Sequence, residues 1–273
     1  MTDYEVDFRS LDGTALRGTV TPSSAPAAAL AVLAHGAGVT REEGGFFARL
    51  AVGLAAAGVT CLRFDLRAHG ASGGRLSDVT IAGVANDIRA ASDHLTRISD
   101  RPGSVHVISA SFSGGAAAMH TARRPGDVDR LVLLNPRMDY RNRFITEEAG
   151  WSGDYLSRER ATKLDERGFA VRAPFEVGRG LLNEVFQLPE PEDVCAAVQR
   201  PVLIVHGTKD TFVDVELSRR YAPLFGAGAE LYELEGAQHG FAVHEDPQYA
   251  HPQSQVWQRE VIAKVADFLT TTV

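Results

Sequence analysis

Short, almost unbroken apolar runs recur along the chain, and they form the clearest pattern in the sequence. Runs of this kind are typical of strands whose two faces are both buried in a parallel sheet. They cover residues 30–35, 59–65, 105–109, 131–135 and 201–207. Two alternating segments, YEVDF and ALRGTV, flank the turn LDGT and predict an early pair of strands, and ELYELEG predicts a late strand.

Segments that favour helices separate these runs. Residues 80–98 carry apolar side chains at helical spacing, and residues 46–58 and 114–124 also favour helices. A closing amphipathic helix is predicted over residues 254–269. Because strands alternate with helices, we expect an α/β fold with a mostly parallel central sheet and helices on both of its faces.

The alternation is interrupted between residues 136 and 199. This interval is rich in charged, aromatic and glycine residues, and its one clear amphipathic stretch is LLNEVFQL. We interpret residues 1–135 and 200–273 as one core, and residues 136–199 as a helical cap, or lid, inserted over the edge of the sheet where the strands end. A helical decoration with no part in binding is the alternative.

Composition limits the classes of partner. The chain has 273 residues, enough for one large α/β domain, and its net charge of −7 makes nucleic acid and anionic membranes unfavourable partners. No apolar run approaches the length of about 20 residues that a membrane span needs, and the acidic N-terminus is unlike a signal peptide. Cys61 and Cys195 lack the spacing of metal ligands, although the two could pair. A reduced, cytoplasmic setting is expected.

Three side chains with complementary chemistry follow predicted strands. Ser111 follows VHVIS, Asp210 follows PVLIV and His239 follows ELYEL, so all three are expected on one rim of the sheet. A serine hydroxyl becomes a nucleophile when an imidazole accepts its proton, and a carboxylate fixes the tautomer of that imidazole. Asp214 lies close enough in sequence to compete with Asp210. No pair of histidines has the spacing and neighbours of a metal site.

Five motifs in order resemble those of the α/β-hydrolase superfamily: LAHGAG, FDLRAHGASGG, SASFSGG, HGTKD and GAQHGF. The resemblance covers nearly the whole chain outside residues 136–199. It implies the chain order nucleophile, acid, histidine, and an oxyanion hole made by the backbone N–H groups of Ala37 and Phe112. It also implies that His35 has a structural role in the oxyanion loop.

The serine turn departs from the family pattern. The pattern G-x-S-x-G appears at residues 109–113 as SASFS, with serine in place of both glycines. The strand register favours Ser111 as the nucleophile, and the turn resembles the A-S-x-S elbow of the myristoyl-carrier-protein thioesterases of luminous bacteria. In a second register, residues 110–115 match the pattern and Phe112 takes the nucleophile position. In either register, Gly114 and Gly115 begin the predicted helix, and we expect them to allow close packing of that helix against the sheet.

Two hypotheses follow from the two registers. In the first, the protein is a serine hydrolase that cleaves an ester, a thioester or an amide through an acyl-enzyme on Ser111, without any cofactor. In the second, it is a non-hydrolytic epimerase, cyclase or binding protein in peptide natural-product maturation, with Phe112 at the turn and no acyl-enzyme. In both, the partner is a small molecule or a peptide.

The substrate pocket is expected to take side chains from the 136–199 interval. The candidates are Arg137, Met138, Tyr140, Trp151 and Phe175. Any one of them could instead belong to the core of the cap. Arg137 follows a predicted strand end, where it could pair with a carboxylate of the substrate or with an acidic residue of the cap.

Overall fold

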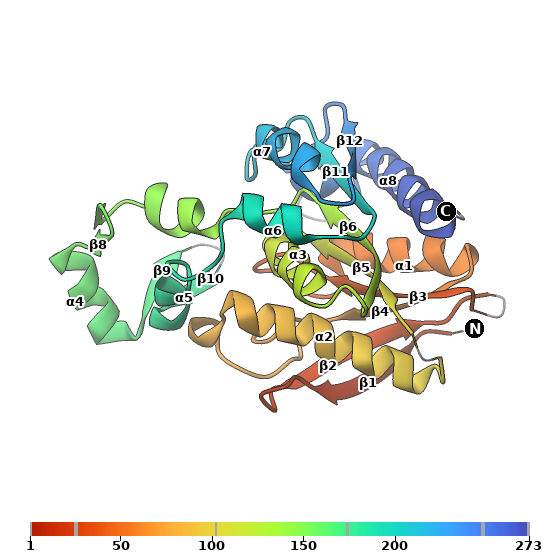
Figure 1. Cartoon of the computed structure of the whole chain (residues 1–273), viewed down its shortest axis with the longest axis horizontal. Coiled ribbons are helices and arrows are strands. Elements are labelled where there is room, and N and C mark those ends of the chain that lie inside the picture. Colours follow the sequence, from red (N-terminus) through yellow and green to blue (C-terminus); the bar gives the residue numbers. More distant parts are fainter. Residues whose placement is uncertain (1, 25–26, 102, 173–174, 247–248, 272–273) are drawn as a thin grey trace.

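An eight-stranded sheet forms the centre of the protein. The computed structural model describes residues 2–24, 27–101, 103–172, 175–246 and 249–271 (Figure 1). The strand order is β1-β2-β4-β3-β5-β6-β11-β12. β2 pairs antiparallel with β1 and β4, and the remaining pairs, from β4 to β12, are parallel. The strands are β1 (Tyr4–Arg9), β2 (Ala15–Thr21), β3 (Ala29–Ala34), β4 (Val59–Phe64), β5 (Val105–Ala110), β6 (Val128–Leu134), β11 (Val202–Gly207) and β12 (Ala229–Leu234).

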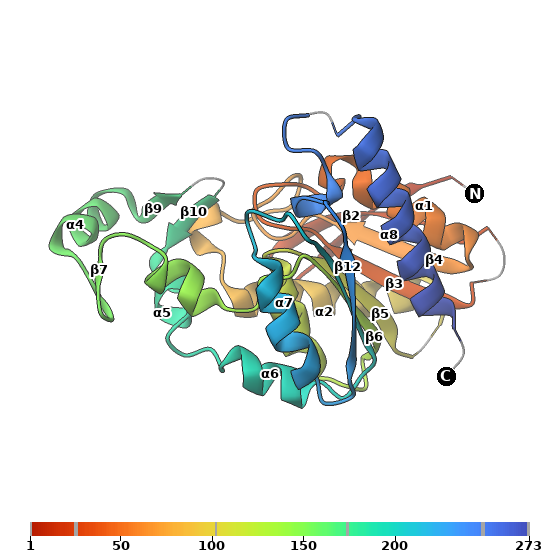
Figure 2. The same ribbon diagram turned by 90° about the horizontal axis from the view of Figure 1, so that it is seen from above.

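Helices cover both faces of this sheet (Figure 2), which confirms the expected α/β fold. The helices α1 (Phe46–Ala56) and α8 (Pro252–Thr270) pack on one face, and α2 (Ile81–Ile98) and α3 (Ser113–Arg123) pack on the other. Successive residues of β3 enter opposite apolar clusters, so the strand needs apolar side chains on both faces. Within the described ranges, no helix has the length and apolarity needed to span a bilayer.

Between β6 and β11 the chain leaves the sheet, and part of this segment projects at the left of Figures 1 and 2. Its helices are α4 (Arg158–Arg167), α5 (Arg179–Glu184) and α6 (Pro191–Ala197). It also contains two small hairpins, formed by β7 (Trp151–Ser152) with β8 (Tyr155–Leu156) and by β9 (Phe169–Arg172) with β10 (Phe175–Gly178). The insertion therefore contains the expected helices and, in addition, two hairpins that were not predicted. Strands of two to four residues are too short for an alternating pattern to reveal them.

The projecting segment is fastened to the N-terminus of α2. Glu184 accepts hydrogen bonds from the backbone N–H groups of Ile81 and Ala82, at 2.5 and 2.8 Å. A carboxylate in this position satisfies N–H groups that have no partner within the helix and interacts favourably with the helix dipole. Gly178 also approaches Ser77 so closely that a Cβ atom on Gly178 would lie 1.9 Å from the Ser77 carbonyl oxygen.

The two cysteines do not pair. Cys61 and Cys195 are both buried and free, and they belong to different apolar clusters. Burial raises the pKa of both thiols, so neither is activated as a nucleophile at neutral pH.

The loops that follow β11 and β12 meet at Gly207. A Cβ atom on this residue would lie 2.3 Å from the carbonyl oxygen of Ala237, in the loop that carries His239. We expect Gly207→Ala to destabilise the fold by about 1–3 kcal/mol, because the loop must move to admit the methyl group. Gly126→Ala is the matched control, since a Cβ atom there meets nothing within 4 Å. Urea unfolding measures both variants, and equal stability would contradict this account.

Candidate active site

The turn between β5 and α3 holds Ser111 in a left-handed backbone conformation. Its φ is +51°, a region that residues other than glycine rarely adopt and that costs about 1–2 kcal/mol. Three hydrogen bonds hold it there. The Ser111 N–H donates to the Leu134 carbonyl, and the Ser111 carbonyl accepts from the N–H groups of Gly114 and Arg137, each at 2.9 Å. The strained residue is therefore tied to the end of β6 and to the first turn of α3.

The two serines that replace the family glycines satisfy each other. Ser109 and Ser113 are fully buried, and their hydroxyl oxygens lie 2.6 Å apart. The Ser113 hydroxyl also lies 3.0 Å from the carbonyl oxygens of Ala34 and Ala110. Because each hydroxyl is small and hydrogen-bonded, the turn accommodates both without leaving a buried polar group unpaired. Gly36, across the turn, leaves room for Ser111, since a Cβ atom on Gly36 would lie only 3.2 Å from the Cβ atom of Ser111.

Ser111, His239 and Asp210 form one continuous chain of hydrogen bonds. The Ser111 Oγ lies 2.9 Å from His239 Nε2, and His239 Nδ1 lies 2.6 Å from Asp210 Oδ2. The acidic partner at Nδ1 places the imidazole proton on that nitrogen, so Nε2 is free to accept the serine proton. The three residues follow β5, β12 and β11, and the structure therefore brings all three predicted residues to one edge of the sheet.

Asp210 is held as a buried carboxylate. Its Oδ1 accepts hydrogen bonds from the backbone N–H groups of Phe212 and Val213, at 2.8 and 2.9 Å. Its Oδ2 lies 3.3 Å from the Nε2 of a second histidine, His206. Burial alone would raise the pKa of Asp210, but hydrogen bonds from His206 and His239 hold it well below its usual value. The carboxylate thus stays ionised at neutral pH.

The competing carboxylate has another task. Asp214 accepts a hydrogen bond from the Glu216 N–H at 3.0 Å and caps the N-terminus of α7 (Val215–Tyr221). It is Asp210, and not Asp214, whose carboxylate hydrogen-bonds to His239. Asp210 is therefore the acid that faces the histidine.

Polar side chains hold the backbone of the loop that follows β3. The Gly36 N–H donates to Glu43 at 3.0 Å, and the Gly38 N–H donates to His69 Nε2 at 3.1 Å. His35 donates to the Gly36 carbonyl through Nδ1, and its Nε2 accepts from the Leu66 N–H. Burial, and to a smaller extent His69, lowers the pKa of His35 to about 3, so this ring stays neutral. His35 has the structural role expected of it.

Between these anchored groups, the Ala37 N–H is left without a partner in the described part of the chain. The N–H of Phe112, directly after Ser111, also donates no hydrogen bond to any described residue. Ala37, Ser111 and Phe112 line one cavity. Two unpaired N–H groups beside a serine hydroxyl are what an oxyanion needs for stabilisation.

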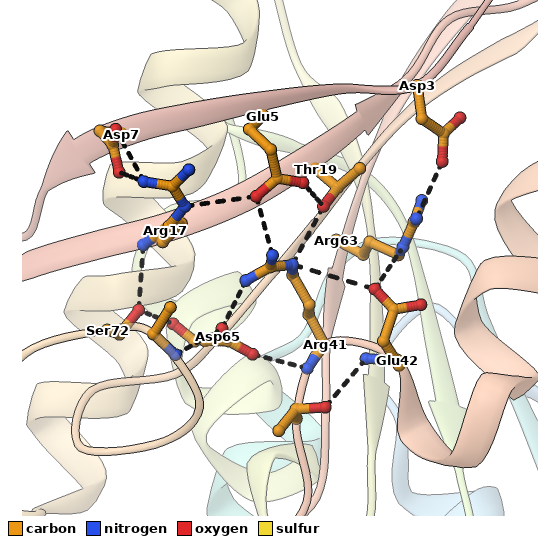
Figure 3. Close-up of polar contacts among 12 residues, drawn as sticks. Asp3, Glu5, Asp7, Arg17, Thr19, Arg41, Glu42, Arg63, Asp65 and Ser72 are labelled. Atoms are coloured by element: carbon orange, nitrogen blue, oxygen red, sulfur yellow. Dashed lines mark hydrogen bonds and ion pairs between the residues drawn. The ribbon is translucent and has the colours of Figure 1, made fainter.

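Ion pairs at the edge of the sheet anchor the same loop (Figure 3). Arg41 donates to Asp65 at 2.5 Å, to Glu5 at 2.8 Å and to Thr19 at 3.0 Å. Asp65 in turn accepts from the Arg41 backbone N–H at 2.8 Å, and its side chain is almost fully buried. The loop that carries Ala37 is thus tied to β1, to β2 and to the end of β4.

The cavity beside Ser111 has a volume of about 410 Å³, within the range of small-molecule sites. Aromatic and aliphatic side chains form most of its wall: Phe112, Phe144, Phe175, Phe212, Val213, Val243 and Tyr249. Phe112 has helical φ and ψ, and its ring packs edge-on against those of Tyr140, Phe144 and Phe175. Ser111 therefore occupies the strained turn position, and Phe112 belongs to the wall.

Two of the five predicted pocket residues, Arg137 and Phe175, line this cavity. Met138 and Tyr140 do not, because they face α3 and line a separate cavity of about 220 Å³. The Tyr140 hydroxyl donates to the Phe112 carbonyl at 2.6 Å and accepts from the Ala116 N–H at 3.0 Å. Trp151 packs edge-on against Phe186, with ring centres 5.8 Å apart. For these three residues the pocket prediction is corrected.

The glycine pair after the turn, Gly114 and Gly115, allows close packing between α3 and the segment that contains Tyr140. A Cβ atom on Gly114 would lie 2.8 Å from Pro136 Cβ, and one on Gly115 would lie 2.7 Å from the Tyr140 ring. The pair thus lets α3 approach the segment that leaves β6, where the sequence had suggested packing against the sheet. Sequence reasoning missed Glu43, Phe144, Phe212 and Tyr249, which lie in loops or in the projecting segment and carry no periodic signal.

Comparison with known proteins places this architecture in a family. A sequence model described as the alpha/beta hydrolase family matches residues 31–251. A monoacylglycerol lipase of Mycolicibacterium smegmatis is 28% identical over 252 residues, which cover 80% of this chain and 83% of that protein. An uncharacterized protein of Mycobacterium tuberculosis is 30% identical over 227 residues, which cover 83% of this chain and 67% of that protein.

Solved structures share the fold. Est1E from Butyrivibrio proteoclasticus with bound ferulic acid superimposes with a TM-score of 0.76 at 19% identity, over 95% of this chain and 99% of that one. Alpha/beta hydrolase domain-containing protein 10 from mouse gives a TM-score of 0.72 at 15% identity, over 97% and 98% of the two chains. At these identities the likeness concerns the fold alone.

Glu43 generates a prediction about pH. Burial raises the pKa of this carboxyl to about 7, and the hydrogen bond from Gly36 only partly offsets the effect. The folded state therefore binds the Glu43 proton more tightly than the unfolded state does. As the pH rises from about 4.5 to about 7, the contribution of Glu43 to the free energy of unfolding therefore falls. In the wild type this contribution falls by about 2–3 kcal/mol across that interval, and we expect the fall to be absent in Glu43→Gln.

Urea unfolding between pH 4.5 and pH 8 measures this contribution. Glu42→Gln is the matched control, since its side chain is 46% exposed. An unchanged pH slope in Glu43→Gln would show that the carboxyl is not desolvated as described.

Proposed function

Because the chain belongs to the alpha/beta hydrolase family, we propose that it is a serine hydrolase that cleaves an ester or thioester of a small molecule through an acyl-enzyme on Ser111. One observation carries the proposal. The strained serine, the histidine and the buried aspartate lie in a single hydrogen-bonded chain, with distances of 2.9 and 2.6 Å. This is the arrangement that general-base activation of a serine requires.

In the proposed reaction, the Ser111 Oγ attacks the carbonyl carbon of the substrate while His239 Nε2 takes its proton. Asp210 stabilises the imidazolium that results. The developing oxyanion accepts hydrogen bonds from the N–H groups of Ala37 and Phe112. The tetrahedral intermediate then collapses, and the leaving alcohol or thiol takes the proton from His239. Water, deprotonated by the same histidine, attacks the carbonyl carbon of the acyl-enzyme. The bond from that carbon to the Ser111 Oγ then breaks, Ser111 takes the proton back from His239, and the acid is released.

Two features support an ester or thioester with an apolar part. The relative from Mycolicibacterium smegmatis is named for its action on monoacylglycerol, which is an ester. The cavity wall beside Ser111 is largely aromatic and aliphatic, so it favours an apolar acyl or alcohol group. We further propose that residues 136–199 act as a cap, since Phe144 and Phe175 contribute to this wall from that segment.

The nucleophile is tested with a fluorophosphonate probe and intact mass. We expect one adduct on the wild-type chain and none on Ser111→Ala, because Ser111 has a base at hydrogen-bond distance and lines the cavity. Ser218 also lies 2.7 Å from a histidine, His206, but it is buried and does not line that cavity. Ser113→Gly, which restores a family glycine at a buried serine of the same turn, should still be labelled. A folded wild-type protein that takes no adduct would favour a non-hydrolytic epimerase, cyclase or binding protein.

The acid is tested by Asp210→Asn. The amide cannot hold the histidine in the required tautomer, so we expect kcat toward a para-nitrophenyl ester to fall by about 10³- to 10⁴-fold with the fold intact. Asp214→Asn is the control and should keep its activity, since asparagine also caps helices. If Asp210→Asn were as active as the wild type, the assignment of the acid would be wrong.

A further inference from the structure

Arg137 is a buried cation without a carboxylate partner. Three arginines are buried in the part of the chain that the structure describes: Arg63, Arg67 and Arg137. Arg63 pairs with Asp3 at 2.8 Å, and Arg67 pairs with Asp87 at 2.8 Å. For Arg137, 9% exposed, no carboxylate of any described residue lies at ion-pair distance.

The guanidinium of Arg137 is only partly satisfied. Its Nη2 donates to the carbonyl oxygen of Phe212, and this is its one hydrogen bond to a described residue. Five N–H donors are available on a guanidinium, so most of its capacity is unused. Burial and the nearby Arg143 lower the pKa of Arg137, but an arginine remains protonated in proteins. A buried charge of this kind is unfavourable unless an anion pairs with it.

Arg137 faces the cavity that contains Ser111. In the sheet, β5 lies between β3 and β6, so the loop that carries Glu43 and the segment that carries Arg137 flank Ser111 on opposite sides. The cavity thus has a carboxyl group on the β3 side and an unpaired guanidinium on the β6 side. Arg143, the second arginine of the wall, has its own partner in Glu147 at 3.5 Å.

The acidic groups near Arg137 are already engaged. Asp210 binds both His206 and His239, and Glu147 pairs with Arg143 at 3.5 Å. The anion that completes the site must therefore come from outside the chain.

We propose that Arg137 binds a carboxylate of the substrate, so that the natural substrate is an ester or thioester whose acyl or alcohol part also carries a free carboxylate. This inference rests on the proposed function and names its substrate class. A carboxylate matches the planar fork of a guanidinium and forms strong, charge-assisted hydrogen bonds with it. The aromatic wall takes the apolar body of the substrate, and Arg137 takes its charged end.

Two pairs of esters test the inference on the wild-type chain. Each pair differs only in a carboxylate or the carboxamide of the same shape. Para-nitrophenyl glutarate monoester and para-nitrophenyl glutaramate place the group on the acyl side, and para-acetoxybenzoate and para-acetoxybenzamide place it on the alcohol side. We expect kcat/KM to be at least about tenfold higher for the carboxylate in one pair. The pair that shows the preference identifies the side that faces Arg137.

Variants then separate binding from mere positioning of the Phe212 loop. Arg137→Gln should abolish the preference for the carboxylate, mainly through KM, and Arg137→Lys should keep part of it. Arg141→Gln is the matched control, because Arg141 pairs with Asp154 outside the cavity, and it should keep the preference. If Arg137→Gln lowered kcat equally for the carboxylate and the carboxamide, Arg137 would only position the loop and the inference would be wrong.

A binding measurement distinguishes failure of this inference from failure of the proposed function. Calorimetric titration of Ser111→Ala with para-acetoxybenzoate and para-acetoxybenzamide needs no catalysis. Tighter binding of the carboxylate, lost when Arg137→Gln is added, supports the inference even if the wild type hydrolyses neither ester. Hydrolysis of all four esters without any charge preference, together with equal binding of the two ligands, overturns the inference and leaves the proposed function standing.

Discussion

The hydrogen bonds that hold Ser111 in a left-handed conformation are the constraint on which the rest of the site depends. They join the serine peptide to the end of β6 and to the first turn of α3, at 2.9 Å each. This turn aims the hydroxyl away from the sheet and toward His239. It also leaves the next backbone N–H, that of Phe112, without a partner among the described residues. The strained turn therefore positions both the proposed nucleophile, the Ser111 hydroxyl, and one proposed donor to the oxyanion, the Phe112 N–H.

Around this turn, buried and half-buried polar side chains fix the backbone. Glu43 and His69 engage the N–H groups on either side of Ala37, and Arg41 ties the same loop to the edge of the sheet. On the other side of Ser111, hydrogen bonds from two histidines and two backbone N–H groups keep Asp210 ionised. Each of these side chains is satisfied. Arg137 stands apart, because no carboxylate of any described residue pairs with its buried charge.

Much of the fold could be predicted from the sequence, since strands buried on both faces leave unbroken apolar runs. The order of Ser111, Asp210 and His239 was also readable, because strand ends of a parallel sheet share one edge. The short hairpins at β7–β8 and β9–β10 left no periodic signal. The pattern also could not predict which side chains of the segment after β6 line the cavity. Arg137 lines it, whereas Tyr140 points to α3. That choice depends on close packing at Gly114 and Gly115, which a single sequence does not express.

The central claim is that Ser111 carries a covalent acyl group during turnover. The most direct measurement is intact mass after rapid acid quench of the wild-type chain with para-nitrophenyl acetate, followed by peptide mapping. The account predicts an acetyl group that accumulates within one turnover on the peptide containing Ser111 and then disappears. Hydrolysis of the ester with no acyl group on that peptide, or with an acyl group elsewhere in the chain, would contradict it.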